Sequence, residues 1–415
     1  MPSPLDLGRL RDAPWLRTPA IRRVFHALDN IGAVSRAVGG AVRNTLLGYA
    51  IDDVDLATTA KPEDVVATAR KAGLHAIPTG LQHGTVTLVS DGVQFEVTTL
   101  RRDVVTDGRH AVVAFTDDWA ADASRRDFTI NALYADADGT LFDPLGGSAD
   151  LAPTRIRFIG NARARIQEDY LRILRLFRFS ARFGDGDIDR AGLDAASAER
   201  AGLSRIAAER VRVELLKLLV APHAAATCRI MQAFGFLVPL IGTAPSPLRL
   251  ERMADIEAAN AVSPDPIRRL AALALYPSGD AGALSRRLRL SGDEHARLRA
   301  IAADMASMQH APQPAEVRRR IYHQGAATCR NILMVGWAQS AISVADDVFR
   351  QRVALADTWT APKLPVDGQD VMALGVAGGP DVGRLLSALD TWWQTTDFAA
   401  SRDACLDELA VRVGR

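Results

Sequence analysis

AVGGAVRNTLLGYAIDDVDLAT, residues 37–58, joins a Gly-Gly turn, a short helical pattern and two aspartates separated by one residue. We expect residues 35–38 to end a strand and residues 41–47 to form a helix that Gly48 closes. Glycine lets a backbone approach a ligand closely, and the start of a helix offers free N–H groups to a phosphate. Arg43, one turn into the helix, adds a fork of donors. The stretch predicts a strand–turn–helix that binds phosphate, although glycines placed only for turn geometry would give the same pattern.

The two aspartates at the end of this stretch, Asp53 and Asp55, flank Val54. Side chains two positions apart share one face of an extended segment. Neighbouring carboxylates repel each other, but Mg2+ is commonly bound by one or two carboxylates together with substrate phosphates. The spacing predicts an Mg2+ site at Asp53 and Asp55, with Asp52 out of phase. A solvated acidic turn is the alternative.

A third acid is predicted on a hairpin that follows. GTVTLV (84–89) and VQFEVTT (93–99) alternate apolar and polar residues on either side of Ser90-Asp91-Gly92, which is a hairpin signal. If this second strand neighbours the segment with the aspartates, Glu96 would lie beside them. In a two-metal mechanism such an acid would help to deprotonate an attacking hydroxyl. An exposed strand glutamate is the alternative.

A helix rich in arginine is predicted further along the chain. Residues 155–182 hold eight arginines and only two acids, Glu168 and Asp169. Residues that step by three share one side of a helix, and Asp169, Arg172, Arg175 and Arg178 step in this way. An aspartate beside an arginine can present acceptor and donors to the edge of cytosine or adenine. A surface ladder of salt bridges, which stabilises little, is the alternative.

These motifs occur in an order that resembles the superfamily of class II tRNA nucleotidyltransferases and bacterial poly(A) polymerases, closest to the CCA-adding tRNA nucleotidyltransferases. The resemblance covers most of the chain and is weakest between residues 222 and 360. It is carried by GGAVRNTLLG (39–48), DDVDLAT (52–58), HGTVTLV (83–89), FEVTTLR (95–101), RRDFTINAL (125–133), DPLGGSADL (143–151), EDYLRILRLFRFSARFG (168–184), AAERVRVELLKLL (207–219) and a tail, LPVDGQDVMALGVAGGPDVGRLLSAL (364–389).

The resemblance implies roles for individual residues of this chain. Asp53 and Asp55 match the metal-binding pair, and Glu96 matches the third carboxylate. Asp127 would position the sugar or the loop. The family usually has Asp at the position of Asn44, which keeps an acceptor oxygen but cannot pair by charge. Residues that match nucleotide contacts are Gly40, Arg43 and Arg126, together with Asp169, Arg172, Arg175 and Arg178 in the segment that reads the base.

The function that the resemblance implies is template-independent addition of C, C and A to the tRNA 3′ end from CTP and ATP, with Mg2+ as cofactor. Residues 100–119 resemble the flexible loop that helps the site switch from C to A, which favours full CCA addition. A poly(A) polymerase, a CC-adding enzyme and a non-catalytic RNA-binding protein are the alternatives. The stretch 78–86 resembles CCA enzymes more than poly(A) polymerases.

Composition is consistent with a globular protein of several domains. The 415 residues carry a formal net charge of +1, so an RNA-binding surface would have to come from the distribution of charge. Only four residues are lysines, and arginine suits bidentate phosphate contacts, although biased genome composition would also explain this. The three cysteines show no metal or disulfide spacing. No apolar run reaches membrane-spanning length, which predicts a cytoplasmic protein that does not contact membranes.

The predicted fold class is α+β, a polymerase-beta-like mixed sheet with helices followed by helices alone. We expect a catalytic head at 1–150, a base-recognising neck at 151–220, a helical RNA-binding body at 221–358 and a helical tail at 359–415 that contacts the tRNA elbow. The sequence does not indicate an oligomeric state.

Overall fold

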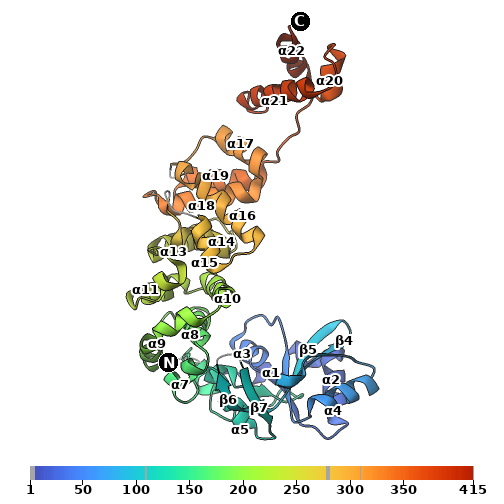
Figure 1. Ribbon diagram of the computed structural model, residues 1–415, viewed down its shortest axis with the longest axis vertical. Coiled ribbons are helices and arrows are strands. Elements are labelled where there is room, and N and C mark those ends of the chain that lie inside the picture. Colours follow the sequence, from blue (N-terminus) through green and yellow to red (C-terminus); the bar gives the residue numbers. More distant parts are fainter. Residues whose placement is uncertain (1–4, 108–109, 277–280, 309, 415) are drawn as a thin grey trace. The chain divides into compact units, whose positions relative to one another are not determined.

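The computed structural model describes residues 5–107, 110–276, 281–308 and 310–414. The chain forms two compact units, residues 1–240 and 241–415, and many of their elements are labelled in Figure 1. The first unit contains a mixed sheet and helices, and the second is helical. The predicted α+β class is confirmed, while the division into head, neck, body and tail stays a prediction.

The sheet of the first unit has seven strands in the order β3-β4-β5-β2-β1-β8-β9. Its only parallel pair within the described residues is β2 with β5, and every other neighbouring pair is antiparallel. The strands are β1 (Ser35–Val38), β2 (Asp55–Thr58), β3 (His75–Gly80), β4 (Thr85–Ser90), β5 (Val93–Thr99), β8 (Tyr134–Ala135) and β9 (Leu141–Phe142).

The strand–turn–helix predicted at residues 35–48 is present. Strand β1 ends at Val38, Gly39 takes a positive φ of 70°, and α3 (Gly40–Leu47) begins directly after it. Gly48, in the left-handed region, ends the helix. The predicted hairpin is also confirmed, because β4 and β5 pair across Asp91 and Gly92, which both have positive φ.

Two helices cover part of the sheet. Helices α2 (Pro19–Asp29) and α4 (Pro62–Lys71) pack on each other and on β4, as Figure 1 shows. The Thr68 hydroxyl of α4 donates to the Ala27 carbonyl of α2 at 3.0 Å. Helix α4 also contacts β5, the strand that carries Glu96. The first unit also contains α1 (Gly8–Arg11), α5 (Trp119–Ser124), α6 (Ser148–Leu151) and the 3-10 helices η1 (Pro14–Arg17), η2 (Leu81–His83) and η3 (Thr129–Asn131).

The segment expected to be a flexible loop, residues 100–119, forms a separate antiparallel pair of strands, β6 (Arg101–Asp107) and β7 (His110–Phe115). Its valines favour extended backbone, a local signal that the charged and glycine residues of the segment obscured. Gly108 and Arg109, within this segment, lie outside the described residues.

The rest of the chain is helical. In the first unit the helices are α7 (Ala162–Glu168), α8 (Leu171–Phe183), α9 (Arg190–Ala198), η4 (Arg200–Arg205), α10 (Ala208–Leu219) and α11 (Ala224–Ala233), and α12 (Leu237–Ile241) runs to the boundary between the units. The second unit contains α13 (Pro247–Ala259), α14 (Pro266–Ala274), α15 (Ala281–Leu288), α16 (Gly292–Asp304), η5 (Met305–Met308), α17 (Pro314–Gln324), α18 (Ala326–Gln339), α19 (Asp347–Thr358), α20 (Gly368–Ala373), α21 (Pro380–Thr395) and α22 (Arg402–Val413). Within the described residues, no helix is both long and apolar enough to cross a membrane.

Candidate active site

A cleft of about 450 Å³ in the first unit brings most of the predicted site residues together. The cleft is open to solvent. It is bounded by the β1–α3 turn, the start of β2, the RRD segment (residues 125–127) and α8. Three of the predicted site residues, Asp53, Glu96 and Arg178, are not among the described residues that line the cleft. The lining residues are Gly39, Gly40, Arg43, Asp55, Arg125, Arg126, Asp127, Asn131, Asp169, Arg172, Arg175 and Phe179.

The acids lie at one edge of the sheet. Asp55 is the first residue of β2, and the parallel register places it opposite Glu96 on β5. Asp53 precedes the strand, and all three residues are exposed. Asp55 is accessible to water yet has protein on several sides. This partial desolvation, followed by the charges of Glu96 and Asp53, raises the pKa of Asp55 to about 6.

The β1–α3 turn provides the opposite wall. Gly39 adopts a conformation that residues with a side chain rarely adopt, and a Cβ there would lie 3.5 Å from the Asn131 carbonyl oxygen and 3.8 Å from Arg126 Nη1. Helix α3 has no side-chain cap at its N-terminus. Its first N–H groups and the adjacent Arg126 therefore form a surface that suits an anion.

Arg43 is a buried cation whose hydrogen-bond acceptors are carboxamides. Asn44 Oδ1 accepts from Arg43 Nε at 3.1 Å and from Nη2 at 2.8 Å, and Asn131 Oδ1 accepts from Nη1. The guanidinium lies 4.1 Å from the centre of the Phe183 ring. Burial, and after it the charge of Arg178, lowers the pKa of Arg43 to about 9. The positive charge of Arg43 is thus held in place by groups that do not neutralise it.

The RRD segment is fixed by an acid that the sequence did not single out. Asp122, on α5, is 1% exposed. Its carboxylate accepts from Arg125 Nε at 2.8 Å, from Arg126 Nη2 at 3.1 Å and from the Tyr134 hydroxyl at 2.8 Å. Arg126 also donates to the Tyr134 hydroxyl at 3.3 Å. The orientation of Arg126 therefore depends on Asp122.

The predicted base-facing stripe is only partly helical. Helix α8 begins at Leu171 and carries Arg172, Arg175 and Arg178, whereas Asp169 has an extended backbone before the helix. The expectation that Asp169 lies on the same helix is wrong, because its side chain accepts from the Leu171 N–H at 3.1 Å and so precedes the first turn. Arg210 of α10 contacts both oxygens of Asp169, at 3.1 and 2.7 Å.

Three carboxylates around the cleft are each shared by two arginines. Asp122 pairs with two arginines of the RRD segment, and Glu168 pairs with Arg165 at 2.9 Å and Arg172 at 2.5 Å. Glu214, on α10, pairs with Arg178 at 2.6 Å and lies 3.8 Å from Arg175. The groups around Asp122 and Glu168 each keep a surplus positive charge, whereas the group around Glu214 is balanced because Arg175 also pairs with Asp127. These pairs confirm that the arginines make salt bridges, yet the surplus leaves the cleft attractive to a polyanion.

Asn131 and Asp127 form the floor of the cleft. Both are 8% exposed. Asn131 Nδ2 donates to Asp127 Oδ1 at 2.9 Å, and Arg175 Nε donates to Asp127 Oδ2 at 2.6 Å. Although burial alone would raise the pKa of Asp127, Arg175 holds it below its ordinary value. The resemblance implied a positioning role for Asp127. Asn131 and Glu214 lie in motifs that carried the resemblance, but neither was singled out, and no motif contained Asp122.

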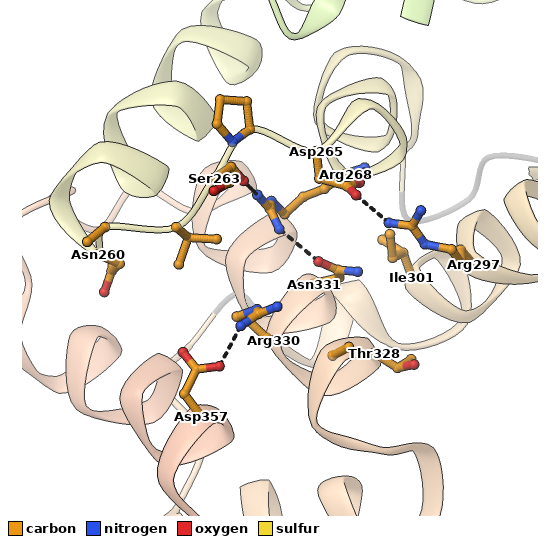
Figure 2. Close-up of a pocket in the computed structure, with 14 residues that line it drawn as sticks. Asn260, Ser263, Asp265, Arg268, Arg297, Ile301, Thr328, Arg330, Asn331 and Asp357 are labelled. Carbon is orange, nitrogen blue, oxygen red and sulfur yellow. Dashed lines mark hydrogen bonds and ion pairs between the residues drawn. The ribbon is translucent and has the colours of Figure 1, made fainter. Parts of the chain in front are cut away.

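The second unit contains a larger cavity, of about 630 Å³. It lies between the α13–α14 loop and helices α16, α18 and α19, as Figure 2 shows. Its arginines make ion pairs: Arg297 with Asp265 at 2.5 Å, and Arg330 with Asp357 at 2.5 Å. The buried Glu257 is shared by Arg268 at 2.6 Å and Arg269 at 2.7 Å. The cavity has neither the Gly-Gly turn nor the predicted acids, which lie in the first unit, so the smaller cleft is the better candidate for binding a triphosphate.

Known proteins resemble the chain along most of its length. A family model described as the poly A polymerase head domain matches residues 35–157, and one described as a probable RNA and SrmB-binding site of polymerase A matches residues 187–245. The chain is 36% identical over 381 residues to the mitochondrial CCA tRNA nucleotidyltransferase 1 of Mus musculus, covering 89% of this chain and 85% of the relative. It is 32% identical over 379 residues to a CCA-adding enzyme of Levilactobacillus brevis, covering 89% and 91%.

Solved structures give the same result. The Bacillus stearothermophilus CCA-adding enzyme in complex with CTP matches with a TM-score of 0.73 and 27% identity, over 95% of this chain and 98% of that one. The Thermotoga maritima CCA-adding enzyme complexed with tRNA has the same fold, with a TM-score of 0.68 and 20% identity over 98% of each chain. This chain belongs to the class II CCA-adding enzyme and poly(A) polymerase family. It is a nucleotidyltransferase, and the resemblance found in the sequence is confirmed.

Proposed function

We propose that this protein completes the tRNA 3′ end by adding C, C and A from CTP and ATP without a nucleic-acid template. The terminal 3′-hydroxyl attacks the α-phosphate in line, a new P–O bond forms, and the bond to the β-phosphate breaks to release pyrophosphate. The observation that carries the proposal is the cleft that places Asp55 beside a surplus of arginines, in a chain related along 89% of its length to CCA tRNA nucleotidyltransferases.

The triphosphate would bind at the β1–α3 wall. Arg43 and Arg126 supply positive charge and donors there, and Gly39 and Gly40 allow the backbone N–H groups of α3 to approach the phosphates. Asp122 holds Arg126 in place before the substrate arrives. Binding in this position brings the α-phosphate toward the acids at the edge of the sheet.

The base would face α8 and the residue that precedes it. Asp169, Arg172 and Arg175 line the same cleft as the phosphate-binding residues. An aspartate acceptor next to arginine donors fits both cytosine and adenine, which show an amino donor beside a ring acceptor. Arg178, paired with Glu214 outside the lining, would support Arg175 rather than contact the base.

The acids are suited to Mg2+ in the presence of substrate. Asp55 and Glu96 lie in directly opposed positions of adjacent strands, and partial desolvation, followed by the charge of Glu96, raises the pKa of Asp55. Within the described residues, no group of three His, Cys, Asp or Glu side chains could hold a metal alone, so substrate phosphates would complete the coordination. Asp53 and Asp55 would hold the ion, and Glu96 would help to take the proton of the attacking hydroxyl. When bound, Mg2+ lowers the pKa of that hydroxyl and offsets charge on the phosphates.

Competition between protons and Mg2+ gives a testable pH dependence. The pKa of Asp55 is raised from 3.8 to about 6, so below that pH its carboxylate is protonated and cannot bind a cation. At limiting Mg2+, CTP incorporation is expected to fall tenfold per pH unit below about pH 6. Higher Mg2+ should move this fall to lower pH, because metal and proton compete. Rate–pH profiles at several Mg2+ concentrations test this, and profiles that do not respond to Mg2+ would contradict it.

Omission of single nucleotides distinguishes the candidate products. On a tRNA that lacks its three terminal nucleotides, CTP alone should add two residues, and CTP with ATP should add three. ATP alone should add one residue to a tRNA that already ends in CC. Gel electrophoresis with single-nucleotide resolution measures the products. A ladder of ATP additions on any RNA would indicate a poly(A) polymerase, a stop after two cytidines a CC-adding enzyme, and no addition a non-catalytic RNA-binding protein.

The remaining parts of the chain would contact tRNA. Residues 151–220 would select the base, 221–358 would bind the acceptor stem, and 359–415 would reach the elbow, mostly through shape and phosphate contacts. The three cysteines are buried and unpaired. The cytoplasmic location stays an expectation from the sequence, since relatives of this chain include mitochondrial as well as bacterial enzymes.

A further inference from the structure

A continuous line of side-chain hydrogen bonds crosses the floor of the cleft. It begins at Asn44 of α3, which bonds Arg43 through Oδ1 and donates through Nδ2 to the Ala50 carbonyl at 2.9 Å. From Arg43 the line passes to Asn131 and then Asp127. It ends at Arg175 of α8, which contacts Asp127 at 2.6 Å. The line thus joins the proposed triphosphate wall to the proposed base-facing helix.

Asn131 is the residue of this line whose role requires a carboxamide, because no other side chain of that size both accepts and donates in this geometry. Its carboxamide accepts from the cation of Arg43 on one side and donates to the anion of Asp127 on the other. A carboxylate would repel Asp127. An apolar side chain would remove the acceptor of Arg43 Nη1 and would leave Asp127 Oδ1 with only the Phe128 N–H as its donor. Asn131, in η3, is thus the hydrogen-bonded link between the cation of Arg43 and the anion of Asp127.

We propose that Asn131 is a positioning residue for nucleotide selection, which keeps Arg43 un-neutralised for the triphosphate and holds Asp127, and through it Arg175, at the angle needed to contact the base. The inference rests on the proposed function and deepens it. Asn44 supports the same line from the other end, because its amide bonds Arg43 without removing its charge. This gives the departure from the Asp usual in the family a physical role.

The test uses Asn131→Ala in the full chain, with tRNA that lacks its terminal nucleotides and each of CTP, ATP, UTP and GTP. We expect kcat/KM for CTP to fall about a hundredfold. The fall for UTP should be smaller, so the preference for CTP over UTP should drop about tenfold, with KM rising more than kcat falls. A residue needed only for folding would lower all four nucleotides in proportion, and that result would overturn the proposal.

Asn331→Ala in the second unit is the matched control. Asn331 is also 8% exposed, and its Oδ1 also accepts from an arginine, Arg268, at 3.0 Å, as Figure 2 shows. We expect a similar fall in thermal stability and no change in nucleotide preference. An equal change of preference in this control would overturn the proposal.

A second variant keeps the proposal testable if Asn131→Ala does not fold. Asn131→Asp preserves shape but places a carboxylate against Asp127 and Arg43, and titration calorimetry with CTP should show affinity about tenfold weaker than in the unmodified protein. Unchanged affinity would overturn the proposal. If the unmodified protein binds CTP but adds no nucleotide to tRNA, the proposed function fails, whereas the same calorimetric comparison still judges whether Asn131 positions Arg43.

Discussion

Asn in place of Asp55 is expected to lower incorporation of both CTP and ATP on the order of a thousandfold, with tRNA binding unchanged. Asp55 is the acid that both lines the cleft and lies opposite Glu96 in the register of β2 and β5. Amidation keeps the size of the side chain but removes the charge that would hold Mg2+ against the α-phosphate. Single-turnover incorporation and a tRNA filter-binding assay measure the two quantities separately.

Asp52→Asn is the matched control for this variant. Asp52 is also exposed and lies three residues earlier, before β2 begins. The same chemical change there should leave incorporation within about twofold, as expected for an exposed charge away from the reacting groups. If both variants keep normal turnover, the assignment of the acids is wrong, and if both lose it, charge near the cleft matters rather than the position of Asp55.

Asn in place of Asp122 is expected to be the most destabilising of these single changes. Asp122 is buried and accepts from Arg125, Arg126 and Tyr134. Removing its charge leaves two guanidinium groups without their shared partner, at a cost of about 3 kcal/mol in the free energy of unfolding. For a unit of this size the midpoint of thermal unfolding should fall roughly 10 °C. Differential scanning calorimetry measures this fall, and weaker CTP binding should accompany it because Arg126 loses its orientation.

Asp136→Asn is the appropriate comparison for Asp122. Asp136 accepts from a single arginine, Arg36, at 2.8 Å, and 35% of its side chain is exposed. Such a pair contributes about 1 kcal/mol or less, so the unfolding midpoint should move by a few degrees at most. Equal falls of the unfolding midpoint in the two variants would show that a buried acid shared by two arginines stabilises the protein no more than a partly exposed single pair.

Local sequence patterns were sufficient to predict those elements of the candidate site that depend on residues close together in the sequence. Glycine conformations and alternation of apolar residues predicted β1, α3 and the β4–β5 hairpin, and face alternation placed Glu96 with the aspartates. These features depend on residues a few positions apart or on one strand pairing. The arginine stripe of α8 was also predictable, because helical spacing alone puts Arg172, Arg175 and Arg178 on related turns.

The rest of the candidate site depends on contacts between residues distant in sequence. Arg43 and Asn131 are 88 positions apart, and Arg175 and Asp127 are 48 apart, so no periodicity connects them. Asp169 was placed on a helix because its spacing fitted, but its carboxylate bonds the first turn instead, and a competing local hydrogen bond of this kind ends the helical pattern. Such side-chain choices are settled by tertiary packing.

The cleft takes its positive charge from arginines, and none of its lining residues is a lysine. Acetylation and other acylations act on lysine amines, so they leave the electrostatic field of this cleft as it is. Arginine also stays protonated across physiological pH. Lysine acylation therefore does not change the electrostatic attraction between this cleft and its nucleotides, whereas it would weaken that attraction in a site lined by lysines.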